Sequence, residues 1–310
     1  RYNKFIFLNE ISNNFLEIKS CNFDLLKCDY DNISLENFKN FLEQKNENLN
    51  SEKLFISNNF SSYNNGIFQR SAKELKKFKN YNYKNINLTT NKFVKHDIDY
   101  KKKILKLNYL NASGRAIISY SNLKNFKIKF LNSFTNPNFK ETNFYGITGC
   151  LLISDSYVEN TTIEGSGSAC EDSVNFLRTN GNIDLLKISN SSYDAIDADF
   201  SNLTFKKIIV EKSGNDCLDL SYGEYFVSNV LINKCGDKGI SVGEKSKLNL
   251  EGGIIQEIEI GVASKDQSLT NIKNLKIINF KHKCLIKYQK KQEFGMGELF
   301  SDNVFCDKKS

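Results

Sequence analysis

Apolar and polar positions in the second half of the chain recur with a period of 22 residues. Seven segments can be stacked on one another, beginning at Cys150, Asp172, Asp194, Asp216, Lys238, Ile260 and His282. The third position of each is apolar or a cysteine: Leu152, Val174, Ile196, Leu218, Ile240, Val262 and Cys284. A second apolar column contains Ile188, Val210, Ile232 and Ile254. A fixed period of about this length is typical of a solenoid, in which each repeat forms one coil.

Two strand columns at fixed offsets, without alternating helices, indicate parallel strands wound around a cylinder. The sequence therefore predicts an all-β fold, a right-handed single-stranded parallel β-helix, with about eight coils over residues 111–310. A leucine-rich repeat is the competing solenoid. It would need a regular Leu scaffold with an Asn or Cys step, which this sequence lacks.

Residues 1–110 do not follow the period, and they predict an N-terminal α/β cap or part of a preceding domain. Two short helices are expected there, one beginning near Ser34 and one near Ser71, where Ser71 and Glu74 have capping-box spacing. A cap at this end would cover the first open edge of the solenoid.

Acidic residues gather at the same offsets of successive repeats. Strand alternation places the fourth and sixth positions of each repeat on the outer surface. With the first position they form an acidic wall of Asp172, Asp194, Asp197, Asp199, Asp216 and Asp219, bordered by Lys238 and Lys265 on later coils, with Glu244 and Asp266 in adjoining turns. Because neighbouring strands lie about 4.8 Å apart, these carboxylates need a cation, nearby lysines or raised pKa values.

The acidic wall also has a simpler interpretation. Asp is common at turns, and a solvated row of Asp and Lys can form surface salt bridges that contribute little stability. The acids, however, are confined to the repeats between 172 and 219 and do not occur in every turn. This restriction favours a specific ligand or metal site.

The formal net charge of +7 comes almost entirely from lysine, since the chain has only four arginines. A basic surface favours anionic partners over long range. We expect no nucleic-acid partner, because the sequence has no Arg cluster and no recognised binding motif. We also expect no membrane span, because no apolar run is long enough to cross a bilayer.

Eight cysteines form four pairs that are close in sequence: Cys21 and Cys28, Cys150 and Cys170, Cys217 and Cys235, and Cys284 and Cys306. Such pairs permit disulfides in an oxidising compartment, although sequence alone does not give their connectivity, and we expect an extracellular, periplasmic or cell-surface location. The alternative is that several are small apolar fillers, as the column position of Cys284 indicates. The chain opens on Arg1 without a signal-like apolar segment, and we expect a mature or excised part of a longer chain.

Three motifs on successive repeats resemble a known enzyme family. They are Tyr193-Asp194-Ala195-Ile196-Asp197, Gly214-Asn215-Asp216-Cys217 and Asp237-Lys238-Gly239-Ile240-Ser241-Val242-Gly243, followed by Ala263-Ser264-Lys265. Their order and spacing resemble the polygalacturonases, glycoside hydrolases of the pectin lyase-like β-helix superfamily. The resemblance implies water-activating carboxylates at Asp194 and Asp216 and a substrate-carboxylate binder at Lys265. Asn215 stands where the family has its proton donor, Lys238 where it has a His, and Ala263 where it has an Arg.

A second resemblance is to the calcium-dependent pectate lyases of the same superfamily. Asn215-Asp216-Cys217-Leu218-Asp219 looks like their metal-binding cluster, with Asp194 as the ligand from the preceding coil. The resemblance implies a Ca²⁺ site at Asp194, Asn215, Asp216 and Asp219, and Asn is an acceptable oxygen ligand for this ion. Lys238 or Lys265 would then be the base that removes a C5 proton.

The two resemblances together imply a protein that acts on an acidic, uronate-containing polysaccharide by Ca²⁺-assisted C5-proton abstraction. The residues expected to touch substrate are Asp172, Asp197, Asp199, Glu244 and Asp266. Two alternatives remain open. One is a polygalacturonase-like hydrolase that uses Asp194 and Asp216, and the other is a non-catalytic β-helix that binds or organises a cell-surface polysaccharide.

Overall fold

The computed structural model describes residues 78–132 and 147–308 in full, and four earlier strands by their backbone. The chain divides into two units, Arg1–Lys73 and Glu74–Ser310. The domain boundary expected at residue 110 therefore falls inside the second unit. The helices expected after Ser34 and from Ser71 lie outside the described residues.

The first unit contains one sheet with the strand order β3-β2-β1-β4. Strand β1 pairs antiparallel with β2 and parallel with β4. Cys21 and Cys28 lie directly opposite one another in the antiparallel pair of β2 and β3. The bounds are β1 (Lys4–Ser12), β2 (Phe15–Asn22), β3 (Lys27–Ser34) and β4 (Lys53–Ile56).

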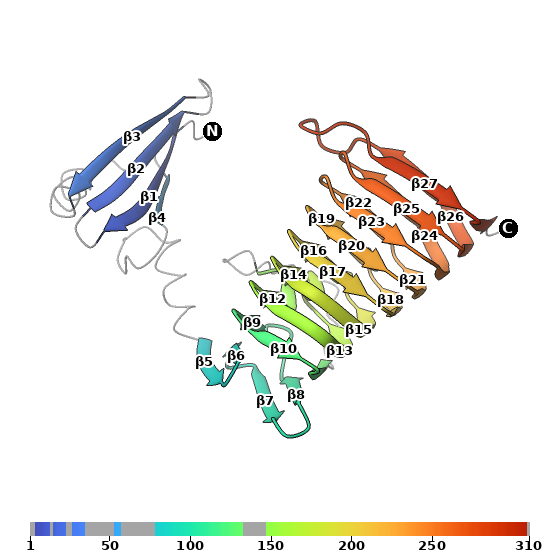
Figure 1. Cartoon of the computed structure of the whole chain (residues 1–310), viewed down its shortest axis with the longest axis horizontal. Helices are drawn as coiled ribbons and strands as arrows, with labels where there is room; N and C mark the ends of the chain where they lie inside the picture. The colour runs from blue at the N-terminus through green and yellow to red at the C-terminus, as the bar shows by residue number, and fades with distance from the viewer. Residues whose placement is uncertain are drawn as a thin grey trace. The chain divides into compact units, whose positions relative to one another are not determined.

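The second unit is a parallel β-solenoid of about seven turns, which confirms the predicted fold with about one turn fewer than expected. No helix occurs in the parts of the chain that are described. Successive coils stack side by side (Figure 1), so each strand pairs with the strand one coil later. A regular coil contains three strands, and the solenoid therefore has three faces.

Face A carries the acidic residues. Its strands are β9 (Ala116–Ser119), β12 (Gly149–Ser154), β14 (Asp172–Leu177), β16 (Asp194–Asp199), β19 (Leu218–Ser221), β22 (Lys238–Gly243) and the ends of β24 (Gly253–Lys265) and β26 (Leu275–Tyr288).

Face B follows face A along each coil. It contains β10 (Asn122–Lys124), the starts of β13 (Tyr157–Ser168) and β15 (Asn180–Ser191), then β17 (Asn202–Phe205), β20 (Glu224–Val227), β23 (Lys247–Leu250), β25 (Leu269–Lys273) and β27 (Glu298–Asp302).

Face C completes the coil. It contains β8 (Ile104–Tyr109), β11 (Lys127–Asn132), the ends of β13 and β15, then β18 (Ile208–Ser213), β21 (Val230–Cys235), the starts of β24 and β26, and β28 (Phe305–Lys308).

Antiparallel strands close the N-terminal end of the solenoid. Strand β5 (Phe78–Tyr83) pairs with β6 (Ile86–Asn91), which adds antiparallel to β9 on face A. Strand β7 (Val94–Asp99) forms a hairpin with β8, the first strand of face C. An antiparallel strand next to β9 ends the parallel stack and covers its open edge.

The interior consists of apolar columns, and the predicted columns hold in the middle of the solenoid but slip by one residue at three places. Val174 pairs with Leu151 rather than Leu152, and Val262 pairs with Leu285 rather than Cys284. Ile232 pairs with Ile255, which leaves Ile254 39 % exposed. At each place the step between coils is 23 residues, and a one-residue shift moves a side chain to the opposite face of its strand.

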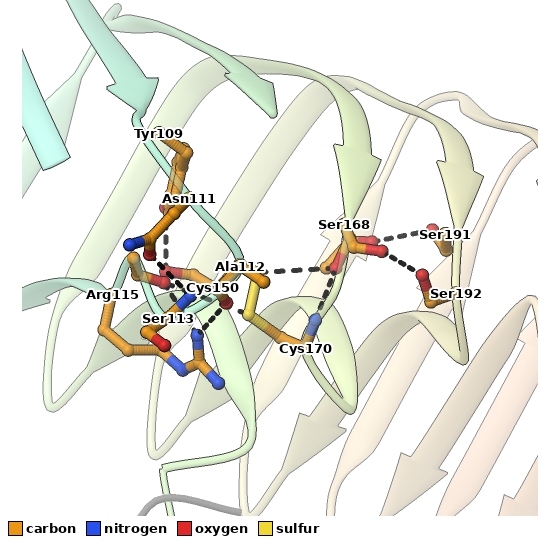
Figure 2. The surroundings of a disulfide bond; sticks show 12 residues. Tyr109, Asn111, Ala112, Ser113, Arg115, Cys150, Ser168, Cys170, Ser191 and Ser192 are labelled. Carbon is orange, nitrogen blue, oxygen red and sulfur yellow. Dashed lines mark hydrogen bonds between the residues drawn. A yellow bond between two sulfur atoms is a disulfide. The ribbon is translucent and has the colours of Figure 1, made fainter. Parts of the chain in front are cut away.

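Three disulfides join the ends of single coils, Cys150–Cys170, Cys217–Cys235 and Cys284–Cys306. Each bond joins two cysteines that are close in sequence, a possibility that the spacing allowed without fixing the connectivity, and Cys284 is not a filler. Figure 2 shows the first of these bonds, where the Tyr109 hydroxyl donates to the Cys150 carbonyl oxygen over 2.7 Å. At the equivalent corner of the next coil, the Ser173 and Ser191 hydroxyls are hydrogen-bonded at 2.6 Å.

Candidate functional site

Two rows of outward side chains run across face A, and strand pairing brings the predicted acids into them. The first row is Asn175, Asp197, Asp219, Ser241 and Ala263. The second row is Leu177, Asp199, Ser221 and Gly243, with Lys265 at the same offset of the following coil. Asp194 lies at the start of β16, and Asp216 lies at the equivalent position one coil later. Face A therefore gathers most of the acidic wall on neighbouring coils.

Asp194, Asp216 and Lys238 form a connected series across three coils. The Asp194 Oδ1 accepts hydrogen bonds from the Asn215 side-chain nitrogen and the Asp216 backbone nitrogen, both at 2.7 Å. The Asp216 Oδ1 accepts the backbone N–H of Lys238 at 2.9 Å and lies 3.4 Å from its Nζ. Lys238 also pairs with the neighbouring Asp237. Each carboxylate thus binds the backbone of the following coil, which fixes its position.

The two carboxyls of this series hold protons more tightly than ordinary aspartates. Burial raises the pKa of Asp194 to about 7, and the charges of Asp216 and Asp219 add to the effect. Burial and Asp219 also raise the pKa of Asp216, although Lys238 opposes the shift. Burial alone would lower the pKa of Lys238, but Asp216 and Asp237 raise it above its ordinary value. Lys238 is therefore a fixed ammonium group, and Asp194 changes protonation near neutral pH.

Asp197 and Asp199 form a second carboxyl pair farther along β16. The Asn175 side-chain nitrogen lies 2.7 Å from the Asp197 Oδ2 and 3.3 Å from the Asp199 Oδ2. Burial, then Asp172 and Asp199, raise the pKa of Asp197 well above its usual range, and the pKa of Asp199 is also raised, mainly by burial. A protonated Asp197 therefore relieves the repulsion between the two carboxyls.

The Asp197–Asp199 pair lines a cleft of about 730 Å³ over the N-terminal half of face A. The cleft passes from β16 across β14, β12 and β9 to the cap strands β5 and β6. Its lining mixes apolar and polar side chains, among them Phe78, Asn80, Thr89, Leu152, Asn175 and Arg178. Such a mixture fits a ligand with both apolar surface and hydroxyl or carboxyl groups.

Asp172 lies at the start of β14 and is only 2 % exposed. Burial raises its pKa well above the ordinary value, and the charge of Asp194 adds to the shift. Its Oδ2 has no hydrogen-bond partner in the described parts of the chain. Burial therefore favours the neutral form of Asp172, and direct contact with a substrate would require the side chain to become exposed.

We expect replacement of Asp172 by Asn to raise the melting temperature at pH 8 by about 2–4 °C, as ~1 kcal/mol does in a domain of this size. The folded protein binds the Asp172 proton more tightly than the unfolded chain does. The stability that this proton contributes to the folded protein is therefore complete at low pH. It is lost as the pH rises from about 4 towards the raised pKa. Thermal denaturation at pH 5 and pH 8 measures this. If the melting temperature changed between pH 5 and pH 8 by the same amount in Asp172→Asn as in the parent protein, the assignment would be contradicted.

Lys265 reaches back across two coils to Asp219. Its Nζ lies 3.7 Å from the Asp219 Oδ1, and its side chain is only 5 % exposed. The stem passes over Gly243, where an added Cβ would lie 2.7 Å from the Lys265 Cε. Glycine at this position therefore leaves the space through which the lysine enters the acidic wall.

Glu244 and Asp266 lie in the turns after β22 and β24. Glu244 accepts a hydrogen bond from the Ser221 hydroxyl at 2.6 Å and pairs with the Lys291 Nζ at 2.5 Å. Burial tends to raise the pKa of Glu244, but the hydrogen bonds from Lys291 and Ser221 outweigh this effect and keep the pKa below its ordinary value. Asp266 is fully buried and accepts the backbone N–H groups of Lys290 and Lys291. Asp266 thus anchors a loop and presents no surface to a substrate.

The residues expected to hold calcium already make hydrogen bonds within the protein, and the calcium site stays a prediction. The Asn215 amide donates to Asp194, and the Asp216 Oδ1 is already bound by two nitrogens of Lys238. Within the described ranges, no group of three His, Cys, Asp or Glu side chains is placed to hold a metal. Positive charge at this site is supplied by the ammonium of Lys238.

The structure adds residues that the sequence pattern did not single out. Asp237 and Lys291 complete the ion pairs of Lys238 and Glu244. Phe200 and Tyr222 stack at 4.6 Å between ring centroids, directly after Asp199 and Ser221. Both have left-handed backbone angles, with φ near 50°. Phe200 and Tyr222 are 22 residues apart, and this spacing could have predicted their stacking from the sequence. The contacts of Lys291 could not be predicted in this way, because they depend on the loop that Asp266 anchors.

No protein-family model, curated protein or solved structure matches this chain. The part of the chain that is described contains no helix with the length and apolar character needed to cross a membrane.

Proposed function

We propose that this protein binds a polysaccharide along face A and hydrolyses it, with Asp194 and Asp216 as the proton-transferring groups. The main support is the stacking of two carboxyls on adjacent coils, the half-buried Asp194 and the buried Asp216, which is 3 % exposed, beside the fixed ammonium of Lys238. Enzymes that cleave glycosidic bonds commonly use one carboxyl as an acid and another as a base. The pKa of Asp194, about 7, suits it to donate a proton near neutral pH.

The roles of the two carboxyls follow from their surroundings. Protonated Asp194 would donate to the leaving glycosidic oxygen. The contact with the Lys238 ammonium favours the ionised form of Asp216, which would accept a proton from the attacking water. In this assignment Asp194 acts as the proton donor, a role that polygalacturonases give to the residue at the position of Asn215.

The proposed substrate is an acidic, uronate-containing polysaccharide. The order and spacing of the three motifs resemble polygalacturonases of the pectin lyase-like superfamily, whose substrates carry carboxylates. Lys238 and Lys265 place positive charge within the acidic wall, and the 54 % exposed ring of Phe200 offers an apolar surface beside it. Three disulfides are consistent with an extracellular, periplasmic or cell-surface location.

The lyase mechanism is the second candidate, and the geometry favours Lys265 over Lys238 as its base. Lys238 is held by two carboxylates, Asp216 and Asp237, which keep its amine protonated. Lys265 has one carboxylate partner, Asp219, at the longer distance of 3.7 Å among the described residues. A lysine base must be neutral before it can remove a C5 proton, and the two carboxylates at Lys238 disfavour that form of Lys238.

The test is to incubate the protein with uronate and neutral polysaccharides and to identify the products by mass spectrometry. We expect saturated oligosaccharides, each cleavage adding one water, from a uronate polymer. Unsaturated products would contradict hydrolysis and support the lyase mechanism. A polymer that binds but stays intact would contradict both mechanisms and support a non-catalytic binding role.

A further inference from the structure

A second groove lies on face C, away from the acidic wall. It has a volume of about 520 Å³ and spans β8, β11, β13 and β15 near the N-terminal end of the solenoid. Lysines from three of these four strands line it, Lys106, Lys129 and Lys187. The charge of this groove is therefore opposite to that of the acidic wall.

The lysines occupy one outward row because their strands are in register. Lys106 pairs with Lys129, Lys129 with Glu164, and Glu164 with Lys187. At about 4.8 Å between strands, the row extends over roughly 14 Å. Lys106 and Lys129 are therefore like charges on neighbouring strands, which destabilises the pair unless an anion lies between or above them.

The single acid in the row does not neutralise it. Glu164 pairs with the Lys127 Nζ at 2.6 Å and with the Lys129 Nζ at 3.6 Å. Hydrogen bonding to Lys127 lowers the pKa of Glu164, so its charge is committed to these partners. Neither Lys106 nor Lys187 forms a salt bridge with any residue in the described ranges. Two ammonium groups at the ends of the row thus remain available to an anionic ligand.

The second outward row of the groove supplies neutral groups. It contains Asn108, Leu131, Ser166 and Ser189 in register. Leu131 is 57 % exposed, whereas the Phe130 ring is buried against Gly165 and cannot stack on a ligand. Hydroxyl, amide and aliphatic groups beside separated ammonium groups suit a sugar chain that carries acidic substituents. Nucleic acid is disfavoured because the groove has neither arginine nor an exposed aromatic face.

We propose that this basic groove on face C binds a polyanionic polysaccharide, with Lys106, Lys129 and Lys187 contacting its carboxylate or sulfate groups. The site would hold the polymer independently of any cleavage on face A. The groove is separate from face A, so loss of activity on face A would leave binding in the groove unaffected.

The test compares two triple variants with the same change in net charge, from +7 to +4. One carries Lys106→Gln, Lys129→Gln and Lys187→Gln. The control carries Lys206→Gln, Lys247→Gln and Lys273→Gln, which lie outside the groove. Affinity electrophoresis measures binding to polygalacturonate, dextran sulfate, neutral dextran and single-stranded DNA.

We expect the groove variant to lose at least about tenfold in affinity for one of the two anionic glycans, and the control to lose less than about threefold. Binding by the parent protein should weaken with added salt because screening reduces attraction between exposed charges. Carboxylated and sulfated ligands are distinguished by which of the two glycans binds more tightly. Equal losses in both variants, binding to neutral dextran, tighter binding to DNA, or no binding to either anionic glycan would each overturn the proposal.

Discussion

Replacement of Asp194 by Asn should lower the rate of polysaccharide cleavage by about 10²- to 10⁴-fold, the range that a general acid contributes. The asparagine can still accept hydrogen bonds from Asn215 and from the backbone of Asp216, so the coil should keep its geometry. It cannot donate a proton to a leaving oxygen with the acidity of a carboxyl. Initial rates of product formation, with melting temperature as a check on folding, measure the effect.

The pH dependence of the parent protein provides a second measurement at the same residue. The proton on Asp194 is needed for the proposed reaction, so kcat/KM should fall as the pH rises through about 7. The matched control is Asp184→Asn, which changes an exposed aspartate on another part of the solenoid. Equal rates in the parent and Asp194→Asn proteins would refute the role of Asp194. A rate that rises with pH through 7 would instead indicate a base with that pKa.

Loss of the Cys217–Cys235 disulfide should lower the free energy of unfolding by about 3 kcal/mol. The two cysteines are 18 residues apart and close a ring around most of one coil in the middle of the solenoid. Without the bond, the unfolded chain gains the conformational freedom of that ring. Denaturant unfolding of a Cys217→Ser, Cys235→Ser double variant measures the loss.

The Cys284–Cys306 bond offers a comparison at the end of the solenoid. Its cysteines lie in a region with exposed strand residues, including Phe305 at 56 % exposure. Local opening is easier at an end than in the middle of a stack. We therefore expect its removal to reduce global stability by less than removal of Cys217–Cys235. The opposite order would show that the terminal coil controls unfolding of the whole solenoid.

The sequence predicted the β-helix because the apolar period is a local property that each coil repeats. It also predicted that Asp197, Asp199 and Asp219 lie on the outer surface, since alternate side chains of a strand point to opposite sides. The same reasoning misplaced Leu152, which lies in the outward row paired with Asn175 and lines the cleft. The coil after Leu152 is one residue longer than the 22-residue period. Because Leu151 and Leu152 are both apolar, the sequence does not show which of them points inward.

The sequence by itself determined the repeat and the column of acids, because these depend on spacing along the chain, whereas the disulfide pairings within the solenoid were decided by the tertiary structure. Only the tertiary structure decided the state of the individual acids. Asp172 is buried and Asp266 anchors a loop, while Asp194 lies between Asn215 and Asp216. Burial and the charges on neighbouring coils set these pKa values, and both depend on side chains that are distant in sequence. The same reason explains why the lysine row of face C became visible only when four strands were placed in register.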